Sequence, residues 1–325
     1  MELRQFKYFV AIVDSGSLSR AAQQLYVAQS ALSKQMAELE SELDTQLLVR
    51  SRNGVAMTEA GKTFYEYAQG ITKQVGDAKA AVHAAADAIS GTVVAAIPQS
   101  VSPMIALPLM RAAARRYPGV VLHLNEELTG NMADQLVRGR VDMAVFSPTM
   151  PKEDIAFTPI IEEDFVLLES AQSAQRLPSG DVSVAQATAR PLVWPAHAHG
   201  HCTRWLVDAA LESAGHAPAQ VAAEINSVYT LKAAVEAGLG PTIMPLGLAQ
   251  REVAENRLVA HRVDLPAMHR VLGLCLSVHL PTGNAKRAII SLIAEVMREL
   301  SGSGQWAGTR VIRPQAGKPA AQRRA

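Results

Sequence analysis

The side chains near the N-terminus that are best suited to chemistry are ones that hydrogen-bond bases and phosphates. Gln29, Ser30, Ser33 and Lys34 share one short stretch, and its acidic residues begin only at Glu38. Glutamine can pair with adenine through two hydrogen bonds in the major groove, and lysine contacts phosphates. Taken alone, the pattern is equally typical of a solvated helix face, so its surroundings must decide.

A basic turn follows soon after this stretch. Arg50 and Arg52 lie at the base and tip of a turn around Asn53-Gly54, between two β-prone runs at 46–50 and 55–57. Asn-Gly is the strongest two-residue hairpin signal because both central residues need positive φ. A basic hairpin beside a recognition helix can lie against phosphates or enter a minor groove. The two features together favour DNA binding.

A second chemically active group stands in the loop after Trp194. His197, His199, His201 and Cys202 alternate with small residues until the last pair. Imidazole and thiolate are ligands for zinc and Cu(I). Alternate residues of an extended segment point to opposite sides, and the sequence shows no second ligand group. We interpret the run as a polar loop at a binding cleft and expect no metal and no cofactor.

Motifs of the common enzyme classes do not occur in the sequence. It has no nucleophile elbow, no Walker-type loop and no Gly-x-Gly-x-x-Gly that opens a helix after a strand. The nearest approach, 238–241, lacks the third glycine, and its proline removes a phosphate-binding N–H. This segment is better interpreted as a turn entering a strand, so the sequence predicts a protein that is not an enzyme.

Composition is that of an ordinary globular protein. Of 325 residues, 49% are hydrophobic and 19% charged, and the formal net charge is +1, so any basic surface must be local. This length predicts two or more compact units. Cys202 and Cys275 are too few for a disulfide framework. No stretch approaches the roughly 20 apolar residues of a membrane span, and no export signal is evident, so we expect a cytoplasmic protein without a membrane partner.

Three short helical periodicities must position the DNA-contacting residues. Apolar residues recur at helical spacing in 3–13, in 18–25 and in 32–43, and Ser17 is placed to cap the second helix. A brief turn at 26–28 separates the second and third helices, as in a helix-turn-helix. With the hairpin, this predicts a winged helix-turn-helix DNA-binding domain over residues 1–58.

A seven-residue apolar repeat follows this domain. Its members are spaced alternately by four and three residues: Phe64, Ala68, Ile71, Val75, Ala78 and Val82, continued by Ala85 and Ile89. Such a seam predicts a coiled coil. Packing on the chain's own domain is the weaker interpretation because the other faces are alanine-rich or polar. We expect a dimerising linker helix over 59–90, and a dimer suits two DNA half-sites.

Residues 91–300 alternate strand and helix patterns in two sets. This alternation predicts parallel sheets with helices on both faces, arranged as two Rossmann-like lobes with crossings near 162 and 265. Ligands of such sheets bind beyond the carboxyl ends of the strands, here in a cleft between the lobes. Residues 301–325 are rich in Gly, Ala, Pro and Arg and contain no acid. We expect them to form a disordered basic tail.

Several motifs resemble those of LysR-type transcriptional regulators. In the first domain these are 6–10, 16–22, 28–33, 47–50 and 58–61, and in the large region they are 139–145 and 237–245. The likeness covers residues 1 to about 300. Within that family, 7–14 is most similar to the nitrogen assimilation control subgroup.

The resemblance implies an α/β effector domain like that of periplasmic binding proteins, behind a winged helix-turn-helix. It implies a homodimer that assembles into a homotetramer on interrupted inverted repeats of double-stranded DNA, acting as activator or repressor with RNA polymerase as a further partner. By matching motifs, Gln29, Ser30, Ser33 and Lys34 inherit base and phosphate contacts, and Arg50 and Arg52 the wing contacts. The family usually has proline where this chain has Ser30, which leaves the operator preference open.

The same matching implies a small-molecule effector in the inter-lobe cleft. Its predicted lining is Gln99, Ser100, Val101, Ser102, Thr129, Phe146, His201 and Cys202. The helix N-terminus beside it can offer N–H groups to an anion. In the nitrogen subgroup regulation is effector-independent, so a vestigial cleft is the alternative. A solute-binding protein shares the two-lobe architecture, but the chain shows no export signal and residues 1–58 would have no purpose.

Overall fold

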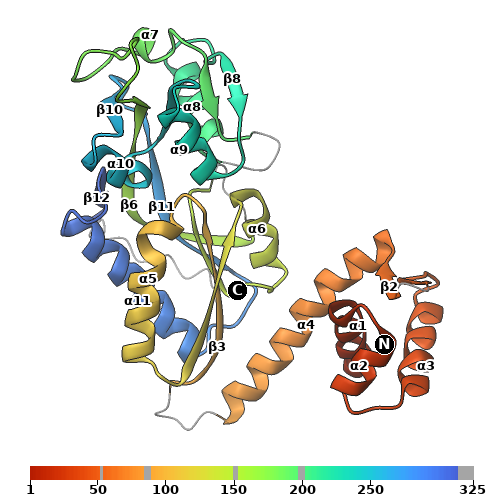
Figure 1. The fold of residues 1–325 in the computed structure, drawn as a ribbon. Coiled ribbons are helices and arrows are strands. Elements are labelled where there is room, and N and C mark those ends of the chain that lie inside the picture. Colours follow the sequence, from red (N-terminus) through yellow and green to blue (C-terminus); the bar gives the residue numbers. More distant parts are fainter. Residues whose placement is uncertain (52–53, 84–88, 149–152, 197–201, 314–325) are drawn as a thin grey trace.

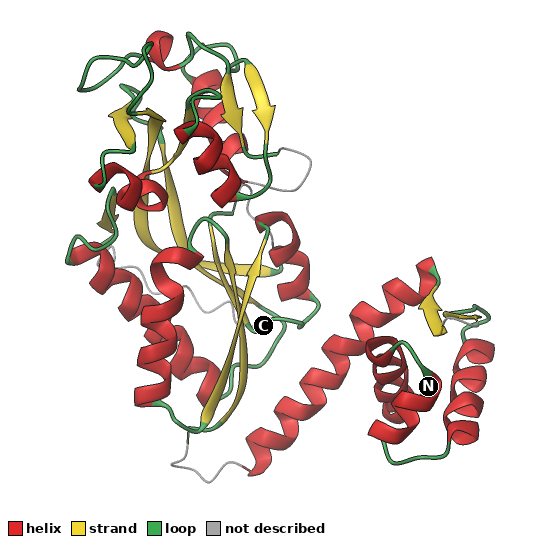
Figure 2. Cartoon of the chain, in the orientation of Figure 1, coloured by secondary structure: helices red, strands yellow, loops and turns green. Residues whose placement is uncertain are grey.

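The computed structural model describes residues 1–51, 54–83, 89–148, 153–196 and 202–313. A small helical head lies at one end of a long helix, α4, and two lobes are stacked beside its other end (Figure 1). Helices and strands alternate through both lobes, whereas the head is almost entirely helical (Figure 2). Within the described part of the chain, no helix has the length and apolar character needed to cross a membrane.

The head consists of three helices and a hairpin, as the sequence predicts. Its elements are α1 (Leu3–Ser15), α2 (Leu18–Gln24), α3 (Gln29–Glu42), β1 (Leu48–Ser51) and β2 (Gly54–Met57). Ser17 caps α2, its Oγ accepting a hydrogen bond from the Arg20 N–H at 3.4 Å. β1 and β2 pair antiparallel across the Ser51–Gly54 turn. The predicted helix-turn-helix and wing are both confirmed.

The long helix α4 (Glu59–His83) differs from the expected seam in its first half. The Phe64 ring stacks on Phe6 at 5.3 Å and meets Phe9 edge-on at 5.1 Å between ring centroids. Ala68 is fully buried and Ile71 half-buried in the same core. The assignment of Ala68 to a partner helix is therefore corrected, whereas for the half-buried Phe64 and Ile71 a partner contact stays a prediction. A short seven-residue repeat and an ordinary amphipathic stripe coincide over a few turns, so the spacing does not identify the partner.

Lobe I is built on a parallel core of β3 (Gly91–Pro98), β4 (Val120–Glu127) and β5 (Met143–Phe146). The helices α5 (Ser102–Arg116) and α11 (Asn284–Gly302) pack on one face, and α6 (Thr129–Val137) packs on the other. Figure 1 shows α5 and α11 side by side, away from α6. The predicted alternation is confirmed here.

Lobe II has a mixed sheet, which corrects the expectation of parallel sheets. The sixteen-residue strand β6 (Ile155–Ser170) pairs antiparallel with β9 (Thr242–Pro245), β10 (Leu258–Arg262) and β11 (His269–Ser277). The sheet order β10-β6-β11-β5-β3-β4 carries β6 and β11 from one lobe to the other. These are the two crossings that the sequence predicts, but as long strands that share one sheet.

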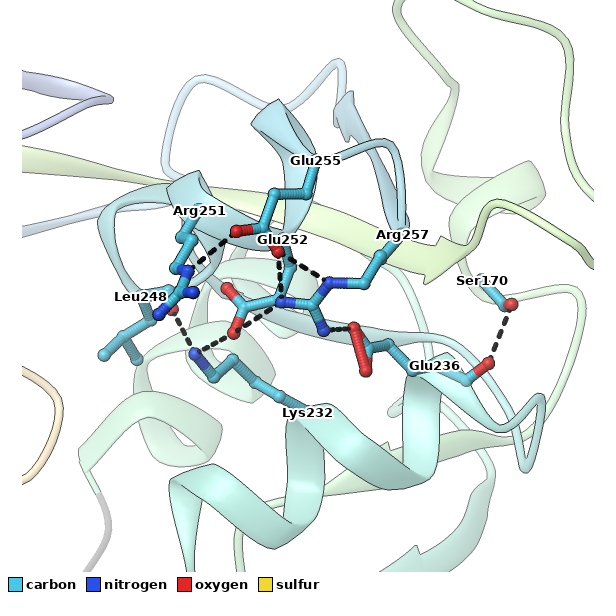
Figure 3. Close-up of polar contacts among 8 residues, drawn as sticks. All are labelled: Ser170, Lys232, Glu236, Leu248, Arg251, Glu252, Glu255 and Arg257. Carbon is cyan, nitrogen blue, oxygen red and sulfur yellow. Dashed lines mark hydrogen bonds and ion pairs between the residues drawn. The ribbon is translucent and has the colours of Figure 1, made fainter.

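The remaining elements of lobe II are short. They are α7 (Val184–Ala187), β7 (Leu192–Trp194), α8 (Cys202–Ser213), β8 (Val221–Glu224), α9 (Val228–Glu236), η2 (Leu246–Ala249) and α10 (Gln250–Ala254). Ion pairs join α9 to α10 and to the turn before β10. Lys232 Nζ donates to Glu252 Oε1 at 2.6 Å and to the Leu248 carbonyl at 2.8 Å, and Arg257 pairs with Glu236 (Figure 3). The sequence does not predict α7, η2 or α10, because helices of four or five residues show no periodicity.

The predicted disordered tail is wrong for its first half. α11 continues to Gly302, and β12 (Thr309–Val311) adds to β6. Between them Trp306 is 1% exposed, and its indole N–H donates to Glu163 Oε1 at 2.7 Å. One buried tryptophan orders a segment whose composition otherwise suggests disorder. Residues 314–325 lie outside the described residues.

Candidate DNA-binding surface and inter-lobe cleft

The N-terminal half of α3 presents its polar residues outward. Gln29, Ser30 and Lys34 are exposed and Ser33 is half-buried, while the opposite side of the helix lies in the head core. Ala28 provides no side-chain cap, so the first N–H groups of α3 are not occupied by an N-cap side chain. An exposed, uncapped helix start suits a phosphate or a base edge.

The charge of Lys34 on this surface is only weakly paired. Lys34 Nζ lies 3.8 Å from Glu38 Oε1, and the two side chains are 77% and 46% exposed. An exposed i,i+4 pair of this kind contributes about 0.3–0.5 kcal/mol, so Lys34 is available for a stronger phosphate contact. Ser19 Oγ donates to Gln29 Oε1 at 3.2 Å, which brings α2 to the start of α3.

The wing is joined to the recognition helix and to the turn before α2. Arg50 Nη1 donates to Ser33 Oγ at 2.9 Å. The Val55 N–H donates to the Gly16 carbonyl at 3.0 Å, and a Cβ at Gly54 would lie only 2.6 Å from that oxygen. The backbone must therefore stay this close, and Gly54 also has φ +123°. Arg52, at the predicted wing tip, lies outside the described residues.

One exposed residue of this surface, Tyr26, is not among those predicted from the sequence. Tyr26, in the turn between α2 and α3, is 95% exposed and has φ 55°, in the left-handed region. An exposed aromatic in a strained turn beside a recognition helix is a candidate for a nucleic-acid contact. The signal in the sequence is a tyrosine in the short connection 25–28, whose other residues are aliphatic.

Between the lobes the structure brings together Gln99, Ser100 and Thr129 from lobe I and Thr203 from lobe II. They line a hollow of about 220 Å³ at the carboxyl ends of β3 and β4. This volume is below the roughly 300–1,000 Å³ of typical small-molecule sites. Thr203 itself was not predicted, although it directly follows the predicted lining residues His201 and Cys202 at the start of α8.

The structure corrects two predicted lining residues. The Val101 and Phe146 side chains are buried in the two apolar clusters of lobe I, and neither lines the hollow. A strand end and a helix start contribute core residues as readily as cleft residues, and spacing does not separate them. Ser102 is the first residue of α5 and is half-buried. His201 lies outside the described residues, as does the side chain of Cys202 at the start of α8.

A buried ion pair holds the cleft loop from behind. Arg270 on β11 and Glu163 on β6 are 1% and 0% exposed, and Arg270 Nε donates to Glu163 Oε2 at 2.7 Å. Arg270 Nη1 also donates to Ser100 Oγ at 2.9 Å. The other Glu163 oxygen accepts from Trp306, so one carboxylate connects the C-terminal segment with the cleft loop.

Comparison with known proteins identifies this arrangement. Residues 3–62 match the model of the bacterial regulatory helix-turn-helix protein, lysR family, and residues 86–298 match the LysR substrate binding domain. The chain belongs to the LysR family of bacterial transcription regulators. This regulator is 35% identical to the nitrogen assimilation regulatory protein nac of Escherichia coli (strain K12), over 92% of this chain and 94% of that protein.

Solved LysR-family structures share the fold. Full-length OxyR from Pseudomonas aeruginosa matches with a TM-score of 0.67 at 21% identity, covering 92% of this chain and 98% of that one. CbnR, solved in a complex with its target DNA, matches with a TM-score of 0.52 at 22% identity, covering 91% and 99%. At these identities the likeness concerns the fold alone.

Two observations on the described residues concern metal and thiol chemistry. No cluster of three metal-binding side chains occurs among the residues that the structure describes. The histidines at 197, 199 and 201 lie outside those residues, so their interpretation as a polar loop stays a prediction. Cys275 is buried in lobe I, and burial raises its pKa to about 12, so its thiol stays protonated and unreactive near neutral pH.

Proposed function

We propose that this regulator binds an interrupted inverted repeat in double-stranded DNA, with α3 in the major groove and the wing along the flanking backbone. The observation that carries this proposal is the contact between Arg50 and Ser33, which joins wing and recognition helix into one polar surface. Gln29 and Ser30 stand at its exposed leading edge and Lys34 one turn behind. Arg52 would extend this surface at the wing tip.

We propose that two copies pair through the second half of α4 and that dimers assemble into tetramers. In the single chain Ala78 is exposed and Val82 is 83% exposed, on the same stripe as the half-buried Val75. An exposed valine on a regular apolar stripe is what a partner helix would cover. We place the head at 1–58, the linker region that contains α4 at 59–90 and the effector domain from 91 to 313; the predicted helix does not extend over residues 89–90.

Two forms of control are candidates. A small molecule in the inter-lobe cleft is supported by the family match of residues 86–298 and by the convergence of Gln99, Ser100, Thr129 and Thr203. Effector-independent regulation is supported by the small size of the hollow, by the Arg270 guanidinium already bound to Ser100, and by the similarity to nac. We also infer that the chain catalyses no reaction and works in the cytoplasm, on its DNA.

Genome-wide mapping of binding sites, followed by titration of the purified protein on those sites, tests the proposal. Lys34→Ala should weaken binding at moderate salt and reduce the slope of log affinity against log salt by about one. Lys79→Ala, on an exposed part of α4, is the matched control and should leave the slope unchanged. Wild-type binding and slope in Lys34→Ala would remove the assignment of this surface.

The same titration separates the two forms of control. If a cleft ligand sets the output, Thr129→Trp, which would fill the hollow, should abolish the response of DNA binding to cell extract metabolites. Effector-independent regulation predicts an unchanged footprint in extract and in buffer, for the wild type and for this variant.

A further inference from the structure

The linker helix α4 carries a second stripe that faces lobe I of its own chain. Glu66, Gly70, Lys73 and Asp77 are spaced by four, three and four residues. At 3.6 residues per turn this stripe points about 140° away from that of Val75, Ala78 and Val82. One face of α4 can therefore contact lobe I while the other remains open to a partner helix.

The closest approach is between two backbones. A Cβ added at Gly70 would lie 2.1 Å from the Arg138 carbonyl oxygen, in the turn between α6 and β5. In return, a Cβ at Gly139 would lie 3.0 Å from Gln74 Nε2, and Gly139 has φ +70°. Any side chain at Gly70 would clash with this carbonyl, so the close approach of the two backbones depends on glycine at this position.

Ion pairs flank this contact on the side nearer the head. The Glu66 carboxylate pairs with Arg138 and lies 3.8 Å from Arg140 Nη2. The Arg138 guanidinium also stands over the Tyr67 ring, 5.3 Å from its centroid. These side chains come from two adjacent residues of α4 and from one turn of lobe I.

A closed ring of four charges stands on the other side. Lys73 pairs with Asp77 at 2.9 Å and with Asp142; Lys286 pairs with Asp77 at 2.9 Å and with Asp142 at 2.8 Å. The Asp142 side chain is 1% exposed, and its second oxygen accepts the Val94 N–H at 2.8 Å. Burial lowers the pKa of Lys286, but Asp142 and Asp77 outweigh that effect and raise it.

We propose that the stripe Glu66, Gly70, Lys73 and Asp77 is a latch that fixes α4 to lobe I. Because Phe64 and Ala68 also fix α4 to the head core, head and lobe I then move as one body. In the dimer proposed above, on which this step rests, the latch sets the separation and tilt of the two heads. It thereby determines the spacing of half-sites that the regulator accepts.

Two glycines of α4 provide a matched test. Gly70→Ala introduces the clash, whereas a Cβ at Gly76, two turns along the same helix, meets nothing within 4 Å. Hydrogen exchange in 66–77 and 138–142 should become about tenfold faster in Gly70→Ala. Gly76→Ala should exchange as slowly as the wild type. Equal protection in both variants would overturn the latch.

A second variant keeps the test valid if Gly70→Ala does not fold. Asp142→Asn retains an acceptor for the Val94 N–H but removes the charge that both lysines share, and it should loosen the same two segments. Unchanged exchange there, in a folded protein, would also count against the latch.

The functional arm uses operators whose half-site spacing is changed by one or two base pairs. Wild type and Gly76→Ala should discriminate between these operators, and Gly70→Ala should bind them within about threefold of each other. Retained discrimination in an unlatched variant would contradict the role in spacing. Light scattering tests the dimer separately, because a monomeric wild type would refute it. If wild type and Gly70→Ala are both dimers of the same mass, the exchange and spacing results test only the latch.

Discussion

Two faces of α4 are held by different kinds of contact. One face, in the first half of the helix, belongs to an apolar core, in which Phe64 lies against Phe6 and Phe9 and Ala68 is fully buried. The opposite face is held by one glycine contact and by ion pairs, with Lys73 and Asp77 side chains 17% and 23% exposed. Apolar burial is insensitive to salt, whereas salt screens ion pairs to the extent that solvent reaches them. We therefore expect salt to weaken the attachment to lobe I more than the attachment to the head.

The largest effect is expected from a change on the apolar face of α4. Phe64→Ala removes both ring contacts and should lower the free energy of unfolding of the head by about 3 kcal/mol. Urea unfolding followed by far-ultraviolet circular dichroism measures it. Tyr67→Ala, which removes an aromatic ring 53% exposed on the same helix, is the control and should cost below about 1 kcal/mol. Equal losses would mean that Phe64 has no special role.

The next largest effect is expected from the ion pairs on the opposite face, between α4 and lobe I. Asp142→Ala leaves Lys73 and Lys286 without their shared carboxylate and the Val94 N–H without its acceptor, so lobe I should lose about 2 kcal/mol. Glu66→Ala removes a pair whose partners are partly exposed and should cost below about 1 kcal/mol. A cost for Glu66→Ala as large as for Asp142→Ala would show that burial does not rank these pairs.

Salt should sharpen the comparison without any mutation. Raising the ionic strength from about 0.1 M to about 1 M shortens the Debye length from about 10 Å to about 3 Å. Hydrogen exchange at 66–77 should then rise about threefold, while the amides of α1 and of Phe64 stay protected. Equally accelerated hydrogen exchange at 66–77 and in α1 would contradict the distinction between apolar and ionic attachment.

The smallest effect concerns pH at the junction of α1 and α4. Burial, followed by the hydrogen bond to Asp14 and its charge, raises the pKa of Tyr65 to about 12, against a smaller opposing effect of Arg140. Since the raised pKa favours the protonated phenol in the folded state, its stabilisation is complete below about pH 10 and is lost between about pH 10 and 12. The phenolate absorbance that Tyr65→Phe removes should titrate near pH 12 in the folded protein; titration near pH 10 would contradict the contact.

Local signals account for the parts that the sequence predicts well. Ser17, the Asn53-Gly54 turn and the apolar spacing of α1 to α3 act over a few residues, so the head follows from them directly. The cleft was predicted from its strand ends, and Gln99, Ser100 and Thr129 do meet there.

The parts that were missed depend on residues far apart in the chain. Thr203 of lobe II meets Thr129 of lobe I at the hollow, and Ser100 meets Arg270 across 170 positions. Phe64 shows a different reason, since one repeat fits both a partner helix and the chain's own core. Gly70 is the clearest omission, because a glycine in mid-helix shows its purpose only when Arg138 lies against it.

The indole of Trp306 has a practical consequence. Its N–H is bonded to the carboxylate that holds Arg270, and Arg270 in turn holds Ser100 at the cleft. The chain contains three tryptophans. Replacing Trp194 and Trp205 by phenylalanine therefore leaves Trp306 as the single tryptophan, hydrogen-bonded through Glu163 and Arg270 to the cleft loop. Its emission then reports, without any attached dye, whether that loop changes when the regulator is exposed to a metabolite or to DNA.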